Sequence, residues 1–105
     1  MRRLRRYELF LPLRFNDGQP VPEELAAEVF LELRERFGGA SCESQVIRGI
    51  WGHGERLFRD DLTRMFVDVP DTSEHEQFFV ELKERLKLRF KQIEIWITTY
   101  PIEAV

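Results

Sequence analysis

Hydrophobic and polar residues alternate along the chain from Tyr7 to Phe15. A period of two over a run of this length is typical of a β-strand. Pro12 removes one ladder hydrogen bond, since proline has no N–H. The strand is expected to end at a turn, Asn16-Asp17-Gly18-Gln19-Pro20.

Two later segments have the spacing of amphipathic helices. The first opens at Pro22-Glu23-Glu24, where a proline and two carboxylates suit a first turn, and it ends at Gly38-Gly39. The second follows Asp71-Thr72-Ser73, which offers N-cap side chains, and continues to about Phe90. The apolar positions three or four apart are Ala26, Val29, Phe30, Leu33 and Phe37 in the first, and Phe79, Leu82, Leu86 and Phe90 in the second.

Three further strands complete the pattern. Residues 42–51 alternate weakly, which favours an edge strand, and Leu62–Val69 alternate clearly. Gly52-His53-Gly54-Glu55 predicts the hairpin connection between them. Ile93, Ile95 and Ile97 mark a last strand, which Pro101 is expected to end.

The order strand, helix, strand, strand, helix, strand predicts an α+β fold of the ferredoxin-like βαββαβ type. Right-handed crossovers place both helices on one face of a four-stranded antiparallel sheet with strand order 4-1-3-2. Residues 1–105 are expected to form a single domain, with a basic N-terminal tail over 1–6 and a C-terminal tail over 101–105.

The helices should cover one face of this sheet and leave the other face bare. The covered face is predicted to carry Leu9, Leu11, Leu13, Met65, Val67, Ile93, Ile95 and Ile97. The uncovered face is predicted to carry an interface formed by Phe10, Leu62, Arg64, Phe66 and Trp96. An exposed aromatic cluster of this size is typical of a contact surface. The leading hypothesis is a small interaction domain that forms a homodimer through this face or through an edge strand.

Composition narrows the classes of function. The chain has 105 residues, is 43% hydrophobic and 33% charged, and has a formal net charge of −3. That charge argues against a surface built for phosphate backbones. No apolar stretch approaches a membrane span and the N-terminus has no long apolar core, so no membrane association and a cytoplasmic location are expected. The one cysteine, Cys42, allows no internal disulfide, and its strand context predicts a buried or half-buried thiol.

The best candidates for chemistry lie near the predicted hairpin. Arg48, Trp51 and His53 could line a ligand pocket, with His53 as a general acid or base, in a small-molecule enzyme of the dimeric α+β barrel type. No partner carboxylate or nucleophile is identifiable by spacing, so whether the chain is an enzyme stays open, as does its ligand. No spacing indicates a metal site or a cofactor.

Single-stranded nucleic acid is a second alternative, because bases stack on exposed aromatic rings. The stretch from Thr63 to Asp68 lacks the RNP1 pattern of RNA-recognition modules, and the face is as acidic as it is basic. Nucleic-acid binding is therefore disfavoured.

Five segments carry a resemblance to a known family: Tyr7-Glu8-Leu9-Phe10-Leu11-Pro12-Leu13, Asn16-Asp17-Gly18, Arg36-Phe37-Gly38-Gly39, Arg48-Gly49-Ile50-Trp51 and Gln92-Ile93-Glu94-Ile95-Trp96-Ile97. With these segments the chain resembles a small bacterial family of uncharacterised ferredoxin-like proteins with no assigned function. The resemblance covers nearly the whole chain and implies the βαββαβ fold and no known activity.

Overall fold

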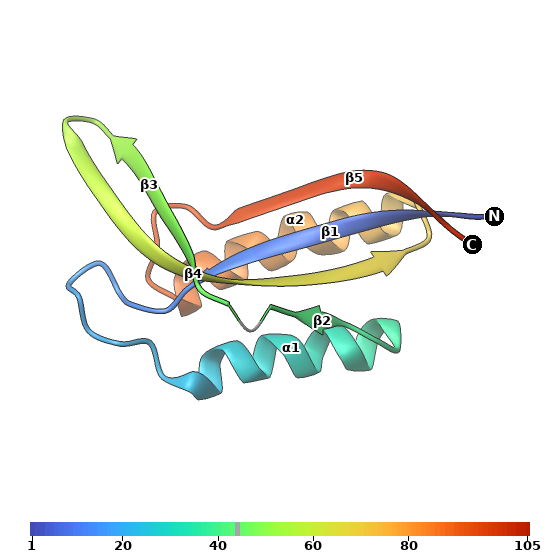
Figure 1. The fold of residues 1–105 in the computed structure, drawn as a ribbon, viewed down its shortest axis with the longest axis horizontal. Helices are drawn as coiled ribbons and strands as arrows, with labels where there is room; N and C mark the ends of the chain where they lie inside the picture. The colour runs from blue at the N-terminus through green and yellow to red at the C-terminus, as the bar shows by residue number, and fades with distance from the viewer. Residues whose placement is uncertain (44) are drawn as a thin grey trace.

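The structure, a computed structural model, describes residues 1–43 and 45–105. This part of the chain forms two helices and a five-stranded antiparallel sheet (Figure 1), which confirms the α+β class. The elements are β1 (Arg2–Pro12), α1 (Glu23–Phe37), β2 (Ser41–Cys42), β3 (Ile47–His53), β4 (Arg56–Val69), α2 (Ser73–Arg89) and β5 (Trp96–Ala104).

The number and order of the strands differ from the predicted four-stranded 4-1-3-2 sheet. The observed order is β2-β4-β1-β5, and β3 pairs with β4 outside this path. The segment predicted as one strand over 42–51 contributes to two: β2 pairs with the C-terminal half of β4 and β3 with its N-terminal half. Ser44, within the predicted strand, lies outside the described residues.

The third predicted strand is longer than expected. It was expected to begin at Leu62, but β4 begins at Arg56, because Asp60 and Asp61 continue the ladder opposite Gly49 and Arg48. The hairpin turn is therefore shorter than predicted and consists of Gly54-Glu55, with Gly54 at a φ of 63°. This long hairpin curves away from the rest of the sheet at the left of Figure 1.

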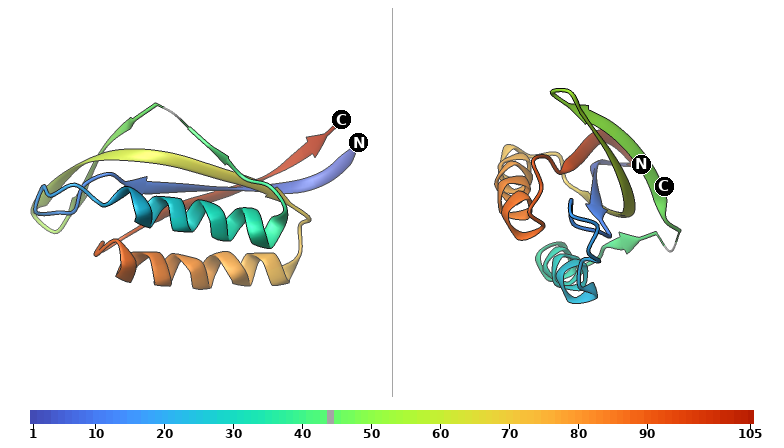
Figure 2. Two further views of the ribbon diagram at one scale, coloured as in Figure 1. Left: turned by 90° about the horizontal axis from the view of Figure 1, so that it is seen from below. Right: turned by 90° about the vertical axis from the view of Figure 1, so that its left-hand side faces the viewer.

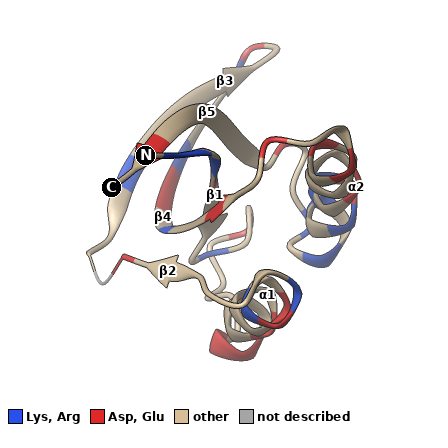
Figure 3. Cartoon of the chain, turned by 90° about the vertical axis from the view of Figure 1, so that its right-hand side faces the viewer, with Lys and Arg blue, Asp and Glu red and all other residues tan. Residues whose placement is uncertain are grey.

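Both expected tails belong to strands. Arg2 in β1 pairs with Ala104 in β5, so residues 1–6 and 101–105 are largely extended and paired, and the two termini lie beside each other (Figure 3). Pro101 does not end the last strand, since β5 pairs only with β1 and an edge strand tolerates proline. The strand instead begins later than predicted, at Trp96, and Ile93 before it is 45% exposed.

The helices cover one face of the sheet, as Figure 2 shows from two directions. Leu9, Leu11, Met65, Val67 and Ile95 are buried on that face, Leu13 and Ile97 are half-buried, and Ile93 is not part of it. The helix residues that complete the core are Val29, Leu33, Phe79, Leu82, Leu86 and Phe90. The expected two-layer packing is thus present, with Ile93 misassigned.

The helix ends follow their sequence signals. The C-cap of α1 is Gly38, which has a φ of 85° and donates its N–H to the carbonyl oxygen of Arg34. Thr72 rather than Ser73 caps α2, by accepting a hydrogen bond from the backbone N–H of His75. Neither helix of the described chain is long and apolar enough to cross a membrane.

Candidate functional site

A cavity of about 600 Å³ lies between the β3–β4 hairpin and the adjoining ends of β1 and β5, and is called the inner cavity below. Its walls are mainly apolar, and it contains three large aromatic side chains, Phe10, Trp51 and Trp96. Aliphatic residues of both hairpin strands, Ile47, Ile50 and Leu62, also line it. Small-molecule sites commonly have this size and this apolar lining.

Trp51 forms a fixed wall of the inner cavity. Its ring stacks on Phe58 with a centroid separation of 4.5 Å and an interplanar angle of 14°. Its indole N–H donates to Asp60 Oδ2 at 2.5 Å. Phe58 is itself covered by the guanidinium of Arg56, which lies 4.8 Å from the ring centroid. These contacts hold the indole in one orientation.

The charged side chains that line the inner cavity are both acidic. They are Asp60 and Glu94, and the described lining contains no lysine or arginine. Lys83 pairs with Glu94 at 2.9 Å from outside the lining, and this hydrogen bond is the main reason that the pKa of Glu94 is lowered. The described chain has no cluster of three side chains placed to hold a metal ion. The inner cavity therefore favours an aromatic, positively charged guest.

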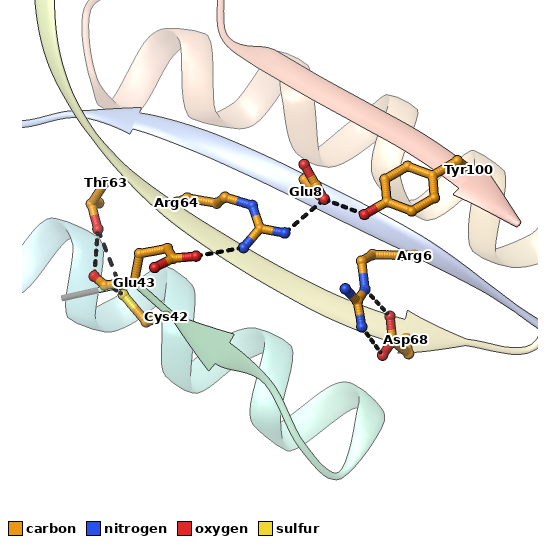
Figure 4. A network of polar contacts seen from close by, with 8 residues as sticks. All are labelled: Arg6, Glu8, Cys42, Glu43, Thr63, Arg64, Asp68 and Tyr100. Atoms are coloured by element: carbon orange, nitrogen blue, oxygen red, sulfur yellow. Dashed lines mark hydrogen bonds and ion pairs between the residues drawn. The ribbon is translucent and has the colours of Figure 1, made fainter. Parts of the chain in front are cut away.

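A buried carboxylate lies next to this cavity on the same sheet face. Glu8, only 9% exposed, accepts hydrogen bonds from Arg64 Nη2 at 2.7 Å and from the Tyr100 hydroxyl at 2.6 Å (Figure 4). The bond from Arg64 is the main cause of the lowered pKa of Glu8. Arg64 also reaches Glu43 at 2.8 Å, which ties the segment after β2 to the sheet. These hydrogen bonds join β1, β4 and β5 on the face of the sheet that carries Phe10.

Phe66 is enclosed by two cations within this network. The guanidiniums of Arg6 and Arg64 each lie 4.4 Å from its ring centroid. Arg6 is held in place by Asp68 through bonds of 2.7 and 3.0 Å. Arg64 thus covers an aromatic ring on the face without helices.

The structure divides the predicted functional residues among three places. Phe10, Leu62 and Trp96, expected at an interface, line the inner cavity together with Trp51, which was expected to bind a ligand. Arg64 and Phe66 lie in the adjoining polar network.

Arg48 and His53 lie elsewhere on the hairpin. Arg48 lines a different cavity, on the opposite face, and His53 is exposed at the end of β3 and lines neither cavity. Cys42 is exposed, contrary to the expected buried thiol, because β2 is a short edge strand.

The carboxylates of Glu8, Asp60 and Glu94 were not identified as functional from the sequence. Glu8 and Glu94 could be placed on the uncovered face by alternation alone. Nothing in the sequence distinguishes Asp60 from Asp61, because the distinction depends on the strand register that turns Asp60 toward Trp51.

No family model and no curated protein matches this chain. Solved structures of phage SAM lyase are among those similar to it in fold. A phage SAM lyase in complex with S-methyl-5'-thioadenosine superposes with a TM-score of 0.67 at 19% identity, covering 96% of this chain and 90% of the other. A phage SAM lyase in its apo state gives a TM-score of 0.60, also at 19% identity, over 95% and 89% of the two chains.

These comparisons correct the leading functional hypothesis. Both similar structures are of an enzyme, and one holds a small molecule, so the non-enzymatic interaction domain that dimerises through the sheet face is no longer supported. The enzyme alternative accounts better for the findings. Two of the aromatic residues that motivated the interface, Phe10 and Trp96, line the inner cavity, whereas Phe66 lies outside it under the guanidiniums of Arg6 and Arg64.

Proposed function

We propose that this chain is an enzyme that binds S-adenosylmethionine (SAM) in the inner cavity and cleaves it as a lyase. The observation that carries the proposal is the composition of that cavity. It combines Phe10, Trp51 and Trp96 with the carboxylates of Asp60 and Glu94, and its described lining has no basic side chain. The fold shared with a phage SAM lyase that binds S-methyl-5'-thioadenosine supports the same assignment.

The chemical groups of SAM suit these walls. Its adenine ring can stack on an indole, an interaction worth about 1–3 kcal/mol for a nucleic-acid base. Its sulfonium is a permanent cation, which aromatic faces attract within about 6 Å of the ring centroid. A phosphate-bearing ligand, by contrast, would meet two carboxylates and no cation.

The proposed reaction removes the positive charge from sulfur. S-Methyl-5'-thioadenosine is what remains when the 3-amino-3-carboxypropyl group leaves SAM. The bond between sulfur and that group breaks, and its electron pair stays on sulfur, which becomes a neutral thioether. The departing chain either loses a proton from the neighbouring carbon and forms an alkene, or closes on its own carboxylate oxygen and forms a lactone.

We assign Asp60 as the carboxylate that attracts the sulfonium of SAM, and Trp51 as the aromatic wall on which the ligand packs. Asp60 is half-buried in the lining and forms no ion pair within the described chain, so its charge is available to a ligand. Its bond to the Trp51 indole keeps both groups in place. Glu8, two residues from Phe10 on β1, and Arg64, opposite Phe10 on β4, are joined by a hydrogen bond, and we assign both as positioning residues.

The experiment incubates the purified protein with SAM and follows S-methyl-5'-thioadenosine by liquid chromatography. Turnover is expected, with the second product identifying the alkene or lactone route. The affinities for SAM and for the neutral thioether are measured in parallel by calorimetry. Trp96→Ala should weaken both by about tenfold, since it removes one stacking surface.

Asp60→Asn separates charge from shape. The variant keeps a hydrogen-bond acceptor for Trp51 but removes the negative charge. The affinity for SAM should therefore fall by about tenfold, and the affinity for the neutral thioether should stay nearly unchanged. The matched control is Glu28→Gln, a carboxylate-to-amide change at an exposed position of α1, which should alter neither affinity. The proposal is wrong if wild-type protein neither binds SAM nor releases the thioether.

A further inference from the structure

A second cavity, of about 720 Å³, lies on the opposite face of the β3–β4 hairpin and is called the outer pocket below. Neighbouring side chains of a strand point to opposite faces. Trp51 and Asp60 line the inner cavity, so Arg48 on β3 and Arg59 on β4, which lie in the alternate rows, face outward. The turn between β1 and α1 closes the other side of the outer pocket, to which it contributes Phe15, Asn16 and Gly18.

Four arginines line the outer pocket: Arg14, Arg48, Arg56 and Arg59. None of them forms an ion pair with a carboxylate of the described chain. Arg14 donates to the carbonyl oxygen of Gly18, and Arg56 covers the Phe58 ring. Arg48 and Arg59 have no such partner in the described chain. Unpaired guanidiniums around one hollow form a strongly positive site.

The two aspartates of the lining do not cancel this charge. Asp60 accepts the indole N–H of Trp51 through its Oδ2, so that oxygen is engaged at the inner cavity. Asp61 is opposite Arg48 in the ladder but forms no ion pair with it. Four cations therefore face at most two anions, in a chain whose formal net charge is −3.

We propose that the outer pocket binds a small anion with two or more adjacent phosphate groups. Arginine is suited to this chemistry, because its planar fork donates two parallel hydrogen bonds to one phosphate. A single carboxylate would leave most of the guanidiniums unpaired. The apolar side chains of Phe15, Ile50 and Leu57 also line the pocket and leave room for an organic group attached to the phosphates.

This proposal is independent of the proposed lyase activity. The inner cavity is acidic and aromatic, whereas the outer pocket is basic, so one ligand does not satisfy both. The hairpin lies between the two sites, and Gly49, Ile50 and Asp60 contribute to both linings.

The test is isothermal titration calorimetry with inorganic pyrophosphate at low ionic strength. Binding in the micromolar to low millimolar range is expected, tighter than for inorganic phosphate. ADP and AMP form the second arm: tighter binding of ADP than of pyrophosphate would identify an organic diphosphate as the ligand, and equal binding would identify the diphosphate group alone.

Arg48→Gln and Arg59→Gln should each weaken pyrophosphate binding by about tenfold, the loss of one charge-assisted contact. The matched control is Arg34→Gln, which removes one positive charge from an exposed position of α1 outside the pocket. It should leave the affinity unchanged. Circular dichroism verifies that each variant is folded.

Three outcomes would overturn the proposal. The first is no pyrophosphate binding to the wild type. The second is an equal loss in Arg34→Gln, which would mean diffuse attraction rather than a site. The third is an affinity for single-stranded oligonucleotides that exceeds that for pyrophosphate and rises with their length, which would mean a nucleic-acid surface.

Discussion

The indole N–H of Trp51 donates to the carboxylate of Asp60 across the β3–β4 hairpin at 2.5 Å. In the ladder Trp51 is opposite Phe58 and Asp60 is opposite Gly49, so the bond runs diagonally. Gly49 has no side chain to occupy the space beside Asp60. A Cβ at that position would also meet Leu62 Cδ1 at 3.3 Å. The bond thus links the two strands of the hairpin at the wall of the inner cavity.

Trp51→Phe should reduce the free energy of unfolding by about 1–3 kcal/mol, because it leaves Asp60 without its donor while retaining much of the ring stacking. Chemical denaturation measures the change. Trp96→Phe is the matched control: Trp96 is 61% exposed and its indole N–H has no protein partner in the described chain, so a loss under about 0.5 kcal/mol is expected. Equal losses in the two variants would show that the diagonal bond does not stabilise the hairpin.

Glu8→Gln should reduce stability at neutral pH by about 1–3 kcal/mol, because the amide accepts more weakly from Arg64 and Tyr100 than the carboxylate does. The pKa of Glu8 is lowered from its ordinary value of 4.5, mainly by the bond from Arg64. The carboxylate's contribution is therefore fully present above about pH 4.5 and is lost as the pH falls through the folded-state pKa.

Urea denaturation of the wild type and of Glu8→Gln, at pH 7 and at pH 3, tests this pH dependence of the stability. The difference between the two proteins should shrink at the lower pH. A difference that is the same at both pH values would mean that the lost stability comes from packing rather than from the charge. Glu28→Gln, at an exposed position, serves as the control and should show little difference at either pH.

Phe66→Leu should reduce the free energy of unfolding by about 1–2 kcal/mol, because it removes the ring whose centroid lies 4.4 Å from each of two guanidiniums. Phe66→Tyr keeps the ring and should be nearly neutral. Thermal or chemical unfolding of both variants separates the cation–ring contacts from simple burial. If leucine is tolerated as well as tyrosine, the contacts with Arg6 and Arg64 contribute nothing measurable.

Gly38→Ala should reduce stability by about 1 kcal/mol, since Gly38 has a φ of 85° at the end of α1 and an added Cβ is strained there. Gly39→Ala is the control at the next position, where no positive φ is found and an added Cβ has nothing within 4 Å. It should be neutral within about 0.5 kcal/mol. A comparable loss at Gly39 would argue against a conformational origin.

The inner cavity could be predicted only in part from the sequence. Alternation placed Phe10, Leu62 and Trp96 on the sheet face without helices, and in the structure all three side chains line the inner cavity on that face. The sequence prediction missed the cavity because it took the sheet to be four-stranded, with its third strand beginning only at Leu62. The fourteen-residue strand β4 instead continues beyond the helices, and its curved hairpin brings Trp51 to the same cavity.

Local patterns alone determined the α+β class, the two helices with their capping residues and most of the buried core, because these depend on side-chain periodicity and on turn chemistry within a few residues. Only the tertiary structure decided the division of residues 42–51, the length of β4 and the closeness of Trp51, Asp60 and Trp96. The physical reason is that strand pairing is a contact between distant residues. Arg59-Asp60-Asp61 has the composition of a loop, and only its ladder with Gly49 and its neighbours makes it a strand.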